Sequence, residues 1–155
     1  MTSVLLVCLG NICRSPMAEG ILRARLRARG LTEAYTVDSA GTAGWHVGRP
    51  ADPRTLEVLA RHDALCPLTA RQVAAEDFER FRWILAMDQS NLTDLQLRCP
   101  PALRDRLHLA LAPTGGGDVP DPYYGGADGF EHVYRLLDTA LDAWLARWEG
   151  QPSGV

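Results

Sequence analysis

Short apolar runs alternate along the chain with longer segments whose apolar residues recur at helical spacing. The run from Thr2 to Cys8 is apolar and β-branched, which is typical of a strand buried on both faces of a parallel sheet. Further strands are predicted over residues 35–39, 83–87 and 107–111. Helices are predicted over residues 16–29, 53–61, 70–81, 89–97 and 130–148.

This order of elements predicts a single α/β domain over residues 1–150, followed by a flexible tail at 151–155. Strands that alternate with helices are joined by right-handed crossovers, so the sheet should be parallel with helices on both faces. In such sheets ligands bind beyond the carboxyl ends of the strands. The loops that could carry chemistry are therefore 8–15, 39–53, 87–91 and 118–126.

The overall composition narrows the class of protein and its surroundings. The net charge of -3 argues against a nucleic-acid partner, and no apolar run approaches the roughly 18 residues of a membrane span. The four cysteines have neither Cys-x-x-Cys spacing nor a histidine pair at zinc-finger distances, so reduced thiols are expected. We expect a cytoplasmic monomer that binds neither nucleic acid nor membranes.

The loop from Cys8 to Ser15 is predicted to bind an anion. A loop between a strand and a helix N-terminus directs backbone N–H groups and the positive end of the helix dipole at one point. Gly10 relieves crowding in a tight loop, and the Arg14 fork can hold an anion in a bidentate contact. The same field, with a hydroxyl such as Ser15 nearby, favours the thiolate form of Cys8 and makes it a candidate nucleophile.

Two of these residues have plausible structural interpretations. A lone cysteine at the end of a buried strand is usually an inert core residue. The combination Cys-x5-Arg-Ser with Gly10 in the same loop makes that interpretation weaker for Cys8. Asp121 opens the sequence DPYYGG, which alone would more often be a turn than an acid. Its functional interpretation depends on the Cys8 loop.

Several motifs in order resemble the low-molecular-weight protein tyrosine phosphatases. They are VCLGNICRSPMAE (7–19), VDSAGT (37–42), GWHVGRPADPR (44–54), ARQV (70–73), ILAMDQSNL (84–92) and DPYYGG (121–126). The resemblance implies a three-layer, phosphatase-I-like fold whose four-stranded parallel sheet has the order 2-1-3-4. It also implies hydrolysis of phosphotyrosine and aryl phosphate monoesters through a cysteinyl-phosphate, inhibition by phosphate-like oxyanions, and no metal or other cofactor.

The resemblance assigns roles to particular residues. Cys8 is the nucleophile, Arg14 binds phosphate, and Asp121 is the general acid and then the general base. The phosphate-binding loop also contains Leu9, Gly10, Asn11, Ile12, Cys13 and Ser15. Asn11 would hold the loop in a strained shape with a hydrogen bond to Ser39, Ser15 would stabilise the Cys8 thiolate, and Asp88 would position Arg14.

The substrate pocket is predicted to hold an aryl ring between Ile12, Trp45, Tyr123 and Tyr124. For Trp45 and Tyr124 a packing role is about as plausible. The arginine phosphatases resemble this chain but have threonine where it has Ile12. Two further alternatives are a thioredoxin-linked arsenate reductase, which would use Cys66 and Cys99, and a phosphate carrier without turnover, which would have little use for Asp121.

Two positions raise separate questions. Cys13 is a candidate redox partner that could form a reversible disulfide with Cys8 and protect it from over-oxidation, although a small buried packing residue is the alternative. Many family members carry a histidine near the loop asparagine where this chain has Leu68. That departure leaves open which groups satisfy the hydrogen-bonding atoms around Asn11.

Overall fold

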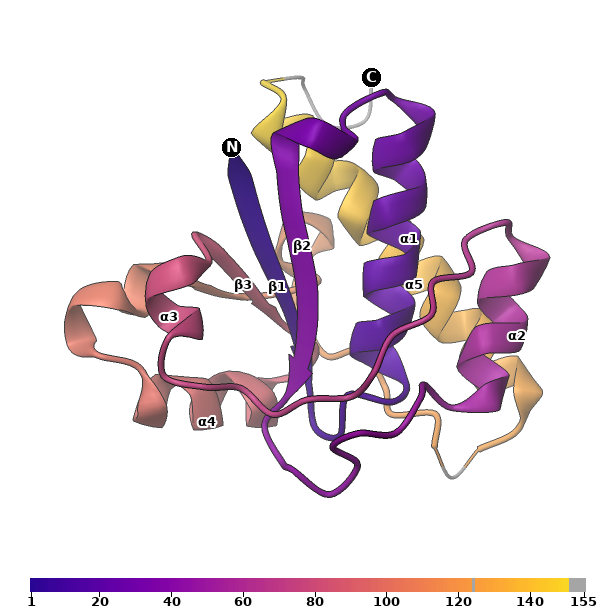
Figure 1. Ribbon diagram of the computed structural model, residues 1–155, viewed down its shortest axis with the longest axis horizontal. Coiled ribbons are helices and arrows are strands. Elements are labelled where there is room, and N and C mark those ends of the chain that lie inside the picture. Colours follow the sequence, from indigo (N-terminus) through magenta and orange to yellow (C-terminus); the bar gives the residue numbers. More distant parts are fainter. Residues whose placement is uncertain (124, 151–155) are drawn as a thin grey trace.

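A computed structural model describes residues 1–123 and 125–150 of the chain. Its four strands are β1 (Thr2–Cys8), β2 (Tyr35–Gly41), β3 (Trp83–Ala86) and β4 (Leu107–Leu109). They form one parallel sheet in the order β2-β1-β3-β4, which confirms the predicted topology (Figure 1). Residues 4–8 of the central strand β1 are all buried, as its uniformly apolar sequence predicts.

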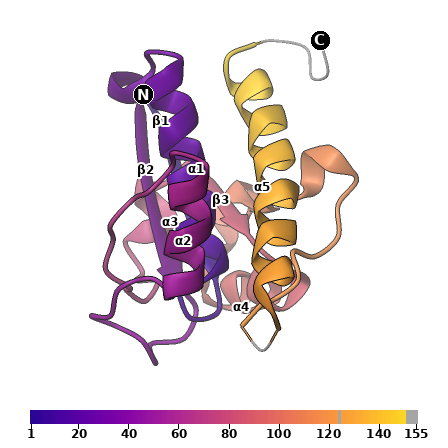
Figure 2. The ribbon, with the colours of Figure 1, turned by 90° about the vertical axis from the view of Figure 1, so that its right-hand side faces the viewer.

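Helices cover both faces of the sheet (Figures 1 and 2). One face packs against α1 (Arg14–Ala28), α2 (Pro53–Arg61) and α5 (Ala127–Trp148) in the larger apolar core. The other face packs against α3 (Asp77–Arg80) and α4 (Gln89–Arg98) in a smaller core. The short 3-10 helices are η1 (Thr32–Ala34), η2 (Pro101–Arg106) and η3 (Ala112–Thr114).

The strand register brings several loops to one edge of the sheet. Cys8, the last residue of β1, lies opposite Gly41 at the end of β2, and Val7 lies opposite Ala86 at the end of β3. A Cβ atom on Gly41 would lie 2.7 Å from the carbonyl oxygen of Leu9, so only glycine allows β2 to approach the loop after β1 this closely. The loops after β1, β2 and β3 therefore meet beyond the carboxyl ends of the strands.

Helix α1 begins earlier than predicted. It starts at Arg14, not at Pro16, and Cys13 occupies the N-cap position without a side-chain cap. The predicted cap residue Ser15 lies inside the helix, and its hydroxyl oxygen is 3.0 Å from the Cys8 sulfur. The helix ends close to the expected point, where Gly30 takes a positive φ of 68°.

The predicted helix over residues 70–81 is wrong for its first seven residues. Only α3, Asp77–Arg80, is helical, and the segment before it pairs with the end of β2. The Gly41 N–H donates to the Arg71 carbonyl at 2.9 Å, and the Val73 N–H donates to the Gly41 carbonyl at 2.8 Å. These hydrogen bonds to a neighbouring strand outweigh the local polar pattern.

The remaining predicted elements agree within a few residues. Strand β2 continues to Gly41, two residues beyond the prediction, and β4 ends at Leu109, two residues before it. The predicted tail at 151–155 lies outside the described residues. Within the described part of the chain, no helix is both long and apolar enough to cross a membrane.

Candidate active site

Residues 9–13 form a tight loop between β1 and α1, and several carbonyl groups of residues 8–12 point away from its centre. Three of them accept hydrogen bonds of 2.8–2.9 Å from backbone N–H groups of the surrounding segments: Cys8 from Thr42, Leu9 from Ala43, and Ile12 from Asp52. In a trans peptide the C=O and the following N–H point in opposite directions. The N–H groups of residues 9, 10 and 13 are therefore turned toward the inside of the loop, where an anion can bind them.

The thiol of Cys8 lies at the base of this loop. The residue is only 2% exposed. Its sulfur is 3.0 Å from the Ser15 hydroxyl oxygen and accepts a hydrogen bond of 3.3 Å from the Asn11 N–H. Two hydrogen-bonding groups thus surround the sulfur, which matches the contact expected between Ser15 and Cys8.

Asn11 adopts a left-handed conformation with φ of 57°, which is unfavourable for a residue with a Cβ. Its side chain holds it there. Nδ2 donates to the hydroxyls of Ser15 at 2.9 Å and Ser39 at 3.0 Å, and Oδ1 accepts from the Arg71 N–H at 2.9 Å. The predicted hydrogen bond to Ser39 is therefore present. Because the Arg71 N–H supplies the donor for Oδ1, the apolar Leu68 leaves that oxygen satisfied.

The guanidinium of Arg14 is fixed from two sides. Nη1 donates to the Asp88 carboxylate at 2.7 Å and to the Val119 carbonyl at 2.9 Å, and the residue is only 2% exposed. Burial lowers the pKa of Arg14, but Cys8, Asp88 and Asp121 raise it further, so its net pKa lies above the ordinary value. The side chain is a fixed positive charge beside the Cys8 sulfur.

Asp121 faces Arg14 from the loop before α5. Its Oδ2 lies 3.7 Å from Arg14 Nη2, and its side chain is 42% exposed. Its Oδ1 accepts a hydrogen bond of 3.1 Å from the Tyr123 N–H, so the residue also forms the turn that its sequence suggests. The turn interpretation and the site interpretation both apply, because the turn directs the second carboxylate oxygen at Arg14.

These residues enclose one cavity of about 240 Å3. Cys8, Arg14 and Asp121 all line it, together with Leu9, Gly10, Ile12, Cys13, Trp45, His46 and Tyr123. Trp45 is 72% exposed and Tyr123 is 38% exposed, as expected for residues at the mouth of a pocket. The remaining predicted pocket residue, Tyr124, lies outside the described residues.

Two residues near the cavity were missed in the sequence. His46 contacts the loop so closely that a Cβ on Gly10 would lie 2.9 Å from its Cδ2. Arg54 donates to the Tyr123 carbonyl at 3.0 Å and lies over the Phe130 ring at 4.5 Å, so it ties the Asp121 loop to α2. Both lie in the segment GWHVGRPADPR, but nothing in that sequence indicates which way they point.

Cys13 lies on the same loop as Cys8 but in different surroundings. Its sulfur is 3.9 Å from Asp52 Oδ2. Burial, followed by the negative charges of Asp52 and Cys8, raises the pKa of Cys13 to about 12. Cys13 is therefore a protonated thiol at neutral pH. All four cysteines, Cys8, Cys13, Cys66 and Cys99, are free thiols in this structure.

Comparisons with known proteins place the chain in a family. The model of the low molecular weight phosphotyrosine protein phosphatase family matches residues 3–152. A low molecular weight protein-tyrosine-phosphatase of Streptomyces coelicolor is 45% identical over an alignment of 158 positions, which covers 97% of this chain and 96% of that protein. The chain belongs to the low molecular weight phosphotyrosine protein phosphatase family, as its motifs predict.

Solved structures agree with this assignment. The structure of a protein tyrosine phosphatase from Entamoeba histolytica with Hepes in the active site has a TM-score of 0.93 and 37% identity. That match covers 97% of this chain and 98% of that one. A drosophila arginine phosphatase matches with a TM-score of 0.89 and 33% identity over 96% of this chain and 98% of that one. The fold alone therefore does not distinguish these substrate classes.

Proposed function

We propose that this protein hydrolyses phosphotyrosine and other aryl phosphate monoesters through a cysteinyl-phosphate. One observation carries the proposal: Cys8 and Arg14, which flank the loop after β1, and Asp121, from the loop before α5, line the same cavity, with Arg14 Nη2 3.7 Å from Asp121 Oδ2. A nucleophile, a fixed cation and a carboxylate in one pocket are the groups that phosphoryl transfer to a thiolate needs. Membership of the family supports the same chemistry.

In the first step, the Cys8 thiolate attacks phosphorus and the bond between phosphorus and the aryl oxygen breaks. The equatorial phosphoryl oxygens lie against Arg14 and the inward N–H groups of the loop, which stabilise the charge of the transition state. Asp121, in its acid form, gives a proton to the departing phenolate. The products of this step are a neutral phenol and phosphorylated Cys8.

In the second step, a water molecule attacks the phosphorus of the cysteinyl-phosphate. Asp121, now a carboxylate, takes the proton from the water, and the bond between sulfur and phosphorus breaks. The electron pair returns to Cys8, where the Ser15 hydroxyl and the Asn11 N–H support the thiolate. Inorganic phosphate is released. Because it fits the same site, we propose that phosphate-like oxyanions inhibit the enzyme.

Four residues support this chemistry without reacting. Asp88 fixes Arg14 through the contact of 2.7 Å, and Ser15 contacts the Cys8 sulfur. Asn11 keeps the loop closed, and Ser39 holds Asn11. Their hydrogen bonds orient groups whose geometry would otherwise relax between turnovers.

The pocket walls favour an aryl substrate. Ile12, Trp45 and Tyr123 line the cavity around the Cys8 thiol and offer apolar surface to a ring above the phosphate. Tyr124 is proposed to join them. The similarity to an arginine phosphatase keeps phosphoarginine as the second candidate substrate. Ile12, where arginine phosphatases have threonine, favours the aryl substrate.

The substrate proposal is tested by comparing rates on phosphotyrosine, phosphoserine and phosphoarginine peptides. p-Nitrophenyl phosphate serves as the simple aryl substrate. We expect hydrolysis of the phosphotyrosine peptide and of p-nitrophenyl phosphate, and none by Cys8→Ser. A lack of aryl phosphatase activity with intact Cys8 would overturn the enzyme proposal, and comparable rates on phosphoarginine would overturn the substrate class.

We also propose that the protein works as a monomer in a reducing compartment such as the cytoplasm. A reducing compartment would keep the Cys8 nucleophile, and the Cys13 thiol on the same loop, in the reduced form that the proposed chemistry needs. Sedimentation analysis of the purified protein tests the monomer, and fractionation of the source cells tests the location.

A further inference from the structure

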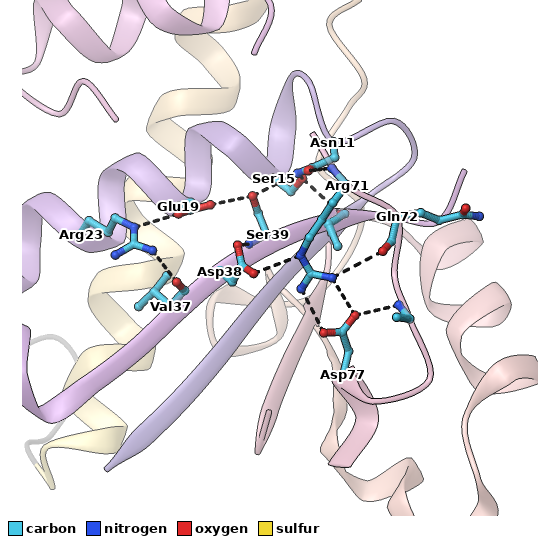
Figure 3. A network of polar contacts seen from close by, with 12 residues as sticks. Asn11, Ser15, Glu19, Arg23, Val37, Asp38, Ser39, Arg71, Gln72 and Asp77 are labelled. Atoms are coloured by element: carbon cyan, nitrogen blue, oxygen red, sulfur yellow. Dashed lines mark hydrogen bonds and ion pairs between the residues drawn. The ribbon is translucent and has the colours of Figure 1, made fainter. Parts of the chain in front are cut away.

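Arg71 connects three parts of the fold beside the phosphate-binding loop (Figure 3). Its Nε donates to the Asp38 carboxylate of β2 at 3.0 Å. Its two terminal nitrogens donate to the two oxygens of Asp77, in α3, at 2.9 and 3.0 Å. Asp77 is 4% exposed, so this fork of hydrogen bonds satisfies both oxygens of a buried carboxylate. The side chain is therefore fixed at both ends of its guanidinium.

The backbone of the same residue reaches the active-site loop. Its N–H donates to Asn11 Oδ1 at 2.9 Å, and its carbonyl accepts from the Gly41 N–H at 2.9 Å. Asp77 in turn accepts from the Ala74 N–H at 2.8 Å, which fixes the chain on the far side of Arg71. The position of the Arg71 peptide is thus set by its own side chain and by β2.

We infer that Arg71 is a positioning residue for the Cys8 loop and that it acts through Asn11. This inference rests on the proposed function. Asn11 has a φ of 57°, a conformation that asparagine tolerates better than most residues but that still depends on stabilising contacts. The Arg71 N–H is the donor that holds Asn11 Oδ1 in that conformation. In the same conformation the Asn11 N–H is directed at the Cys8 sulfur, 3.3 Å away.

Loss of the Arg71 guanidinium should therefore affect Cys8 in two steps. Asp77 loses its bidentate partner and the segment around Arg71 shifts, because a buried carboxylate without a cation is costly. Asn11 Oδ1 then loses its fixed donor, the Arg71 N–H, and the residue can relax, which moves the Asn11 N–H away from the Cys8 sulfur. The expected result is a less stabilised thiolate and a looser anion site in a folded protein.

A second support for Asn11 makes this effect partial. Its Nδ2 donates to Ser39, whose hydroxyl donates to Glu19 at 2.7 Å, and Glu19 is paired with Arg23 (Figure 3). This second chain does not pass through Arg71. The loop should therefore keep its general shape when Arg71 is replaced.

The alternative is that Arg71 only stabilises the fold, and matched variants separate the two roles. Arg71→Gln removes the charge, whereas Arg71→Lys keeps the charge but not the fork that binds both oxygens of Asp77. Asp77→Asn weakens the same contact from the other side. The control is Arg25→Gln, because Arg25 also binds two carboxylates, Asp138 and Asp142, but does so between α1 and α5.

Three measurements follow Cys8 directly in these variants. They are kcat/KM on p-nitrophenyl phosphate, inhibition by inorganic phosphate, and the rate of Cys8 alkylation by iodoacetate as a function of pH. For Arg71→Gln we expect kcat/KM to fall about tenfold, phosphate inhibition to weaken, and the alkylation midpoint to move to higher pH. The changes in Arg71→Lys and Asp77→Asn should be smaller than those in Arg71→Gln. The charged or ionisable groups around Cys8 are Arg14, Asp121, Cys13 and His46, which line the same cavity, and Asp88, which binds Arg14. Every variant keeps them.

A double-mutant cycle identifies the route of the effect. In an Asn11→Ala background, Arg71→Gln should cause little further loss, because the contact that it disturbs is already gone. Two outcomes would show a purely structural role and overturn the inference. One is that the losses multiply in the double variant, and the other is a lowered melting temperature with an unchanged alkylation midpoint. Arg25→Gln should lower the melting temperature and leave the alkylation midpoint unchanged. Failure of the proposed function itself is distinct, since the unmodified protein would then be inactive on p-nitrophenyl phosphate.

Discussion

Asp88 binds Arg14 through one carboxylate oxygen and begins helix α4 through the other. Its Oδ2 accepts from Arg14 Nη1 at 2.7 Å, and its Oδ1 accepts from the Asn91 N–H at 2.7 Å as the N-cap of α4. The orientation of the phosphate-binding arginine is thereby coupled to the start of a helix. Arg14 and Asp88 are 74 residues apart in the sequence.

Two substitutions of Asp88 should separate these functions. Asparagine is a good N-cap but carries no charge, so Asp88→Asn should lower kcat/KM roughly tenfold with little change in melting temperature. Asp88→Ala removes the cap as well, which should cost about 1 kcal/mol and lower the melting temperature by about 2–4 °C. Steady-state kinetics and thermal unfolding measure the two effects. Equal activity of Asp88→Asn and the unmodified protein would contradict the positioning of Arg14 by charge.

The acid role of Asp121 predicts a dependence on the leaving group. Asp121→Asn keeps an oxygen for the Tyr123 N–H but cannot donate the proton in the first step. In the first turnover, before the water attack that also uses Asp121, release of phenol from phenyl phosphate should slow about a hundredfold, and release of p-nitrophenolate should slow much less, because p-nitrophenolate leaves without a proton.

The matched control for this prediction is Asp118→Asn. Asp118 lies three residues earlier in the same segment, is exposed, and accepts a hydrogen bond from the Gln89 N–H at 2.9 Å. It does not line the cavity. This variant should hydrolyse both substrates at nearly the unmodified rates, and a uniform loss on both substrates for Asp121→Asn would argue against a role as acid.

Cys13 is predicted to protect Cys8 during oxidation. Peroxide converts the Cys8 thiolate to a sulfenic acid, and attack by Cys13 on that sulfur forms the disulfide and releases water. Because the pKa of Cys13 is raised to about 12, this step should accelerate as the pH rises.

Recovery of activity measures this protection. Cys13→Ser should keep its initial rate but recover less activity with dithiothreitol after peroxide treatment. Cys66→Ser is the control, because Cys66 is a free thiol that does not line the cavity. Equal recovery in Cys13→Ser and the unmodified protein would leave Cys13 as a packing residue.

The sequence predicts most of the sheet because its strands are specified locally. Strand β1 is an uninterrupted apolar run, and its bounds agree with the prediction from Thr2 to Cys8. Residues 70–76 were predicted wrongly because their structure is imposed by the end of β2, about 30 residues earlier in the chain. Local polarity contains no information about that partner.

The same distinction applies to the site. Cys8, Arg14 and Ser15 lie within one short segment, so their shared function is visible in the sequence. The contribution of Arg71 depends on a hydrogen bond to Asn11 across 60 positions. The contribution of Arg54 depends on a hydrogen bond to the Tyr123 carbonyl, which is 69 positions away in the sequence. The motifs contain both arginines, but only the folded chain shows which groups they bind.

A last prediction concerns stability and pH, and it rests on His108 in β4. Its ring packs against Trp83 at 5.2 Å and Trp144 at 5.6 Å, and its Nε2 has no hydrogen-bond partner among the described residues. Burial, assisted by the positive charge of Arg82, lowers the pKa of His108 below the ordinary 6.5.

The folded protein therefore binds a proton at His108 less readily than the unfolded chain does. The stability that this difference provides is complete above pH 6.5 and is lost as the pH falls through the folded pKa. Urea unfolding between pH 8 and pH 5 should show this loss in the unmodified protein and a flatter profile in His108→Phe, which replaces the imidazole with an apolar ring. His132→Gln is the control, since His132 is exposed on α5, and it should keep the unmodified slope. An unchanged slope in His108→Phe would assign the pH dependence to other groups.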